Sequence, residues 1–177
     1  MTFKRWLPTF LGFPLGGYLA FGTVGSLDDP VSAAAGGLLA GAVIGAAQWL
    51  ALGSRGIGRR WAAYTAAAMG AGAALGAVAT GAGTELADVM LAGLITGAAV
   101  GAAQSTLLAR DGRVSAVWTA VSAVAWPLGW VASAGIIDLE RGWHVFGSSG
   151  ALLVTALTGL ALRRLLEGSP VVAVAAA

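Results

Sequence analysis

The sequence predicts an all-α integral membrane protein in which six transmembrane helices form three repeated hairpins. The composition, six apolar runs and an internal repeat support this prediction. Of 177 residues, 58% are hydrophobic and only 10% are charged, with a mean hydropathy of +0.83. A soluble domain carries about 25% charged residues. So few charges cannot solvate a folded surface, and the chain is therefore expected to fold in a lipid bilayer.

The charged residues separate six apolar runs, at about 6–27, 31–52, 61–83, 89–109, 114–137 and 145–162. Each run has about the 20 residues that a helix needs to cross the ~30 Å hydrocarbon layer. The runs are continuous and rich in Ala, Leu and Gly, which favours helices over strands. The first run follows Lys4 and Arg5 and has no clear cleavage site, so we interpret it as an uncleaved span rather than a signal peptide.

Charges in the connecting segments predict the orientation. One side holds Lys4, Arg5, Arg55, Arg59, Arg60, Arg110, Arg113, Arg163 and Arg164, and the other holds Asp28, Asp29, Glu85, Asp88, Asp138, Glu140 and Arg141. Basic residues gather on the cytoplasmic side of membrane proteins. We therefore expect a multi-pass protein of the bacterial cytoplasmic (inner) membrane, with both termini inside (N-in/C-in).

The internal repeat is visible in two helices that return to the basic side. GLLAGAVIGAAQWLAL at residues 37–52 recurs as GLITGAAVGAAQSTLL at 93–108. The expected unit is a hairpin, and 1–165 would be one domain with repeats at about 1–53, 54–109 and 110–165, followed by a short tail, 166–177. The third return helix has diverged, with Ala151, Thr155 and Gly159 in place of the glycines and Leu162 in place of the glutamine.

Small residues at four-residue spacing line one face of most of these runs. Lipid provides no hydrophobic drive for helices to associate, so close backbone approach at small residues must replace it. We therefore expect a packing role for a set of glycines. These are Gly12, Gly16, Gly37, Gly41, Gly45, Gly72, Gly76, Gly93, Gly97, Gly101, Gly129 and Gly159.

Gln48 and Gln104, the only glutamines, are the main candidates for a functional site inside the membrane. A primary amide in hydrocarbon must form hydrogen bonds. The favoured interpretation is a bond between helices, and the alternative is contact with a solute, an ion's water or a lipid head group. No ionisable residue lies deep in a span, which argues against a carboxylate-based pump.

Three tryptophans of the fifth run share one arc of the helix, and Trp118, Trp126 and Trp130 are candidates to face lipid or an aromatic ligand. Trp6, Trp61 and Trp143 are expected at the membrane interfaces. Pro127 should free the carbonyl of Ala123 and make this helix the one most able to move.

One motif suggests an enzyme. The sequence GSSG at residues 147–150 resembles the G-x-S-G of rhomboid intramembrane proteases, in which a histidine on a later helix activates the serine. Here the only histidine, His144, precedes the serines, and the apolar run that follows this span, VVAVAAA, is too short to form another. The general base is therefore missing. The chain also has no cysteine, which excludes thiol chemistry and cysteine metal ligands.

The segment from Gly41 to Leu52, followed by Arg55, has the pattern GxxxGxxQWLxL and then a basic residue. It resembles uncharacterised bacterial multi-pass membrane proteins built of such hairpins, each with a basic-plus-Trp start like Arg60-Trp61. The second copy departs from the pattern at Ser105. This resemblance implies an architecture and no known activity. A weaker glycine-zipper likeness links the chain to the mitochondrial Tim17/22/23 translocase proteins.

These observations leave three functions open. The favoured one is a non-enzymatic accessory subunit that packs against a larger membrane complex through its glycine-rich faces. The alternatives are a small channel or facilitator that uses Gln48 and Gln104, and an intramembrane enzyme. The expected partners are the lipid bilayer and other membrane subunits, not nucleic acid. No cofactor or metal is expected, although a bound lipid or apolar pigment is compatible with the sequence.

Overall fold

The computed structural model describes residues 2–53, 58–108 and 111–167, and within them all regular structure is helical, as predicted. The elements are α1 (Phe3–Trp6), η1 (Leu7–Leu11), α2 (Gly12–Val24), α3 (Pro30–Leu52), α4 (Arg60–Thr80), α5 (Leu86–Leu108), α6 (Gly112–Ser133), η2 (Leu139–Arg141) and α7 (Ser148–Glu167). The first three run on from one another as a single span, Phe3–Val24.

Five of these helices are long and apolar enough to cross a membrane, namely Phe3–Val24, α3, α4, α5 and α6. The sixth, α7, has 20 residues and carries Arg163 and Arg164 near its end. It begins later and ends later than the expected run 145–162, because the residues just before Ser148 form a connection rather than a helix.

Helix boundaries follow from local sequence signals. The carboxylate of Asp29 accepts hydrogen bonds from the backbone N–H groups of Val31 and Ser32, at 2.6 and 3.0 Å. The Ser32 hydroxyl accepts the N–H of Asp29 in return, and Pro30 fills the first helical position. Helix α4 ends at Thr80 and is capped by Gly81, whose φ of +64° suits glycine.

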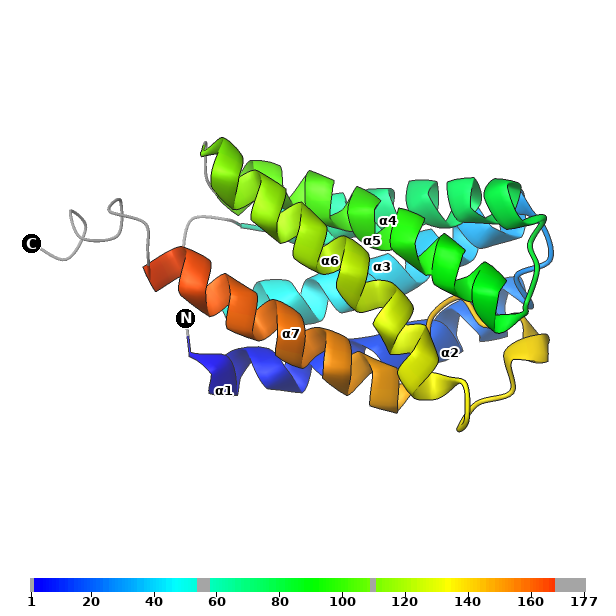
Figure 1. The fold of residues 1–177 in the computed structure, drawn as a ribbon. Coiled ribbons are helices and arrows are strands. Elements are labelled where there is room, and N and C mark those ends of the chain that lie inside the picture. Colours follow the sequence, from blue (N-terminus) through cyan, green and yellow to red (C-terminus); the bar gives the residue numbers. More distant parts are fainter. Residues whose placement is uncertain (1, 54–57, 109–110, 168–177) are drawn as a thin grey trace, which may run out of the picture.

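The helices form a closed ring in chain order (Figure 1). Each one packs on its neighbours in the sequence, and α7 closes the ring by packing on α1, η1 and α2. The start of α1 and the end of α7 lie at the same end of the bundle.

The charged residues of the described segments follow this arrangement. All described Lys and Arg residues except Arg141 lie at the end of the bundle that holds the start of α1, where Asp111 also caps α6; they are Lys4, Arg5, Arg59, Arg60, Arg113, Arg163 and Arg164. The opposite end carries Asp28, Asp29, Glu85, Asp88, Asp138, Glu140 and Arg141, and we call these the basic end and the acidic end. Arg55 and Arg110 lie outside the described residues.

All twelve glycines singled out from the sequence lie against other parts of the same chain. A Cβ added at any of them would come within 3.1 Å of another residue's heavy atom. At Gly97 it would lie 2.5 Å from the carbonyl oxygen of Ser122, and at Gly41 2.8 Å from the Cα of Ala66. The glycine faces are therefore occupied inside the bundle, which corrects the expectation that they are left over for a larger complex.

Candidate functional site

The two glutamines meet inside the ring. The Nε2 amide of Gln104 on α5 donates to Oε1 of Gln48 on α3 at 3.1 Å, and to the Thr65 hydroxyl on α4 at 2.8 Å. All three side chains are buried. Residues from three helices thus form one polar layer. Of these residues, only the two glutamines were candidates from the sequence.

Tryptophan indoles complete this layer. Trp61 Nε1 donates to Gln48 Oε1 at 2.9 Å, and Trp118 Nε1 donates to Gln104 Oε1 at 3.1 Å. Trp6 Nε1 donates to the Thr158 hydroxyl on α7 at 3.4 Å, where the ring closes. In each pair, a tryptophan on a helix that leaves the basic end bonds to a polar side chain on the adjacent returning helix.

The same three tryptophans seal the basic end of the bundle axis. The ring centroids of Trp6 and Trp61 are 6.4 Å apart, and those of Trp61 and Trp118 are 6.2 Å apart. Leu52 and Leu162 pack in the same cluster, and all five side chains are at most 1% exposed.

This arrangement corrects several sequence-based expectations. Trp6 and Trp61 are buried at the axis rather than placed at a lipid interface, because their helices turn that face toward the ring centre. Trp118, Trp126 and Trp130 are also buried, at 1, 5 and 7% exposed, and so do not face lipid. Leu162 does not take the place of a glutamine, since Thr158, one turn earlier, accepts the indole bond.

An aromatic layer lies on the acidic side of the polar one. Phe13 and Phe146 stack with centroids 5.2 Å apart, and Trp126 packs against them at 6.1 and 5.5 Å. Gly97 makes room for Trp126, because a Cβ there would lie 2.8 Å from the Cγ of this tryptophan. The aromatic side chains on the acidic side and the three tryptophans on the basic side enclose the polar layer.

A small cavity of about 10 Å³ lies in the polar layer, on the bundle axis. Its polar lining comes from Gln48, Thr65, Gln104, Ser122 and Thr158. We call it the axial cavity. A space of this size holds about one water molecule.

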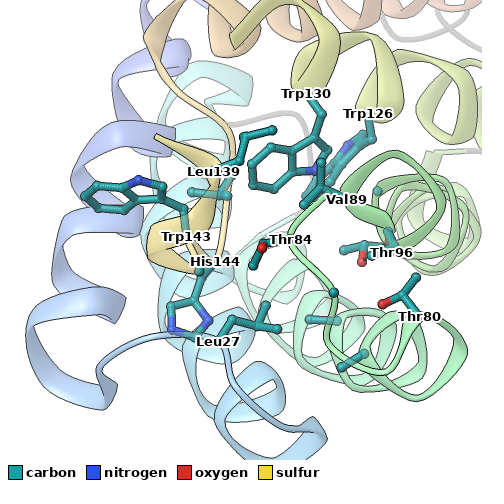
Figure 2. A pocket seen from close by; sticks show the side chains of 17 residues that line it. Leu27, Thr80, Thr84, Val89, Thr96, Trp126, Trp130, Leu139, Trp143 and His144 are labelled. Carbon is teal, nitrogen blue, oxygen red and sulfur yellow. Dashed lines mark hydrogen bonds between the residues drawn. The ribbon is translucent and has the colours of Figure 1, made fainter. Parts of the chain in front are cut away.

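A larger cavity of about 40 Å³ lies near the acidic end, and we call it the vestibule. Figure 2 shows Trp126, Trp130 and Val89 gathered on one side of it and Thr84, Thr80 and Thr96 beside them. The indole of Trp143 points away from these threonines and packs on Phe21 of α2, with centroids 4.7 Å apart. The vestibule is thus mostly apolar, with hydroxyl groups on one wall.

His144 holds the connection between α6 and α7 in place. Its Nε2 donates to the carbonyl oxygen of Gly25 at 2.9 Å, and its ring lies so close to Gly36 that a Cβ there would collide with it. Burial lowers the pKa of His144, and the bond to Gly25 and the nearby Asp28 oppose this only in part. Burial thus favours the neutral imidazole, and its buried Nδ1 has no hydrogen-bond partner among the described residues.

The serines of the GSSG motif are not paired with this histidine. The Ser149 hydroxyl donates to the carbonyl oxygen of Ala132 at 2.8 Å, whereas His144 bonds to Gly25. Among the described residues, no group of three His, Asp or Glu side chains is placed to hold a metal ion.

No protein-family model, curated protein or solved structure matches this chain. The site must therefore be interpreted from its own geometry, in which most of the intramembrane polar groups bond to one another.

Proposed function

We propose that the protein is a non-enzymatic integral membrane protein that acts as an accessory, structural component of a larger membrane complex. In the bilayer its basic end would face the cytoplasm. The observation that supports this role is the mutual hydrogen bonding of Gln48, Gln104 and their tryptophan partners. Catalysis needs polar groups free to meet a substrate, whereas these are used to join helices.

The way it would contact a partner differs from what the sequence suggested. Because the glycines pack within the chain, contact would use the large apolar side chains that point outward. On α2 these include Leu15, Tyr18 and Leu19, at 63, 69 and 47% exposed. Such a surface suits lipid and the apolar helices of another membrane protein equally well.

Purification of the tagged full-length chain from its native membranes in a mild detergent tests this proposal. We expect another membrane protein to co-purify at a fixed ratio to this chain. An unrelated six-span protein with the same tag and expression level serves as the control. A chain that elutes alone, in two different mild detergents, would contradict the accessory role.

A facilitator of a small neutral solute is the second candidate, and the polar axial cavity favours it. The tryptophans at the basic end would then have to move for a solute to pass. The test is solute flux into liposomes for the wild type and for Gln48→Leu with Gln104→Leu. Flux that exceeds that of protein-free liposomes and is lost in a double variant that is still folded supports this candidate, and no excess flux for any small neutral solute refutes it.

A further inference from the structure

The vestibule and the axial cavity have one wall residue in common, Trp126. The rest of the vestibule wall comes from α4, α5, Trp130 of α6 and the connections near the acidic end, whereas the axial cavity is lined by the polar layer and by apolar residues next to it. The indole of Trp126 therefore borders both the pocket near the acidic end and the cavity at the bundle centre.

The axial cavity offers polar groups that are not used elsewhere. Neither the hydroxyl of Ser122 nor the amide nitrogen of Gln48 has a hydrogen-bond partner among the described residues. Both side chains are at least nine-tenths buried, Ser122 at 2% exposed and Gln48 at 9%. Buried polar groups in such a position are normally satisfied by an ordered small molecule such as water.

Trp126 also lies where helix α6 lacks a backbone hydrogen bond. Pro127 follows Trp126 directly and has no N–H to donate to the carbonyl of Ala123, so α6 lacks one backbone hydrogen bond there. The indole is held by ring contacts with Phe13 and Phe146 and has no hydrogen-bond partner among the described residues. A side chain held in this way can change rotamer without breaking a polar interaction.

We propose that the axial cavity is a binding site for one neutral, hydrogen-bonding molecule of about the size of water, and that Trp126 closes it toward the vestibule. Ser122 and Gln48 hold the bound molecule. The two cavities and the unpaired groups belong to this chain alone and require neither a partner complex nor flux across the membrane.

Thiol labelling tests the partition, because the chain contains no cysteine. Ser122→Cys places one thiol in the axial cavity, and the probe is the small neutral reagent methyl methanethiosulfonate. We expect Trp126→Ala to speed labelling of this thiol at least tenfold. The matched control is Trp130→Ala, which removes an indole that lines the vestibule but not the axial cavity. The Trp130→Ala variant should leave the labelling rate within about twofold of the rate for Ser122→Cys alone.

Equal acceleration by the two alanine variants would overturn the proposal, as would a thiol that reacts at the rate of an exposed cysteine while Trp126 is present. If Ser122→Cys or Trp126→Ala does not fold, Thr158→Cys and Trp126→Leu replace them. The bound molecule is tested separately, by a structure of the wild type that resolves ordered water. Density between Ser122 and Gln48 is expected there, and a dry cavity would refute the site.

Discussion

At the scale of single residues, Gln104 is the most connected polar group of the interior. It donates to Gln48 and Thr65 and accepts from Trp118. A single bond between membrane helices contributes only about 0.6 kcal/mol. Leaving a buried donor such as the Trp118 indole without a partner costs more, about 1–3 kcal/mol.

Gln104→Leu should therefore destabilise the protein by about 2–4 kcal/mol, from these lost bonds and the unpaired indole. Gln48→Leu should cost only slightly less, because it also leaves an indole unpaired, that of Trp61, but removes two bonds rather than three. Melting in detergent, followed by tryptophan fluorescence, measures both. Ser105→Ala on the same helix is the control, since this hydroxyl bonds only to its own helix at Ala102. If Gln104→Leu melts at the same temperature as Ser105→Ala, the polar layer does not contribute to stability as we predict.

His144 gives the fold a dependence on pH. Its pKa in the folded protein is lowered from the ordinary 6.5, and it lies in a connection outside the membrane-spanning helices. Well above pH 6.5 the imidazole is neutral in both the folded and the unfolded state, and pH has no effect through it. Below pH 6.5 the unfolded chain binds a proton that the folded protein resists, so the free energy of unfolding falls as the pH falls.

Stability measured between pH 7.5 and 5.5 should therefore decrease toward pH 5.5 in the wild type. His144→Gln should remove most of this slope, because the chain has no other histidine. A wild type whose stability rises as the pH is lowered would show that His144 is protonated in the fold.

The sequence identified the two glutamines but not their partners. Their rarity in an apolar chain marks them, whereas a tryptophan after a basic residue looks the same whether it faces lipid or the bundle axis. The rotation of each helix decides between these, and that rotation is set by tertiary packing. Thr158 was missed for a related reason, because the return helix α7 pairs with Trp6 one turn away from the register that its small residues suggested.

At the scale of helices, the glycine contacts explain how these elements approach so closely. Gly41→Leu and Gly97→Leu should prevent correct packing, because each new side chain would meet backbone atoms of a neighbouring helix. We expect both variants to be lost to aggregation or to melt far below the wild type in detergent. Gly22→Leu is the matched control, since nothing lies within 4 Å of a Cβ there. Wild-type melting of Gly41→Leu or Gly97→Leu would refute the role of these contacts.

The sequence predicted helices better than it predicted where they end. Charged residues and caps mark the boundaries well at Pro30 and near Leu108, because Asp29 caps one helix and basic residues follow the other. The last apolar run, 145–162, begins three residues before helix α7 does. Val145 and Phe146 are as apolar as a span, yet they pack into the core as part of a connection that His144 anchors to Gly25.

At the scale of the whole molecule, the charge distribution is the feature that relates the fold to a membrane. Six carboxylates and one arginine occupy the acidic end of the described chain, and Arg141 pairs there with Asp138 at 3.8 Å. Hydropathy locates the spans but carries no direction. The ring closure by α7 could not be read from the sequence either, since it depends on contacts between the two ends of the chain.

The orientation that we propose from this asymmetry can be tested directly in a chain without cysteine. Single cysteines at Glu85 and Glu140 at the acidic end, and at Arg59 and Arg113 at the basic end, report the two faces. In intact bacterial spheroplasts, a membrane-impermeant maleimide should label Glu85→Cys and Glu140→Cys but not Arg59→Cys or Arg113→Cys. Permeabilised membranes supply the control, in which all four should react. The reverse pattern in intact cells would place the basic end outside, and labelling at both ends would mean that the protein inserts in two orientations.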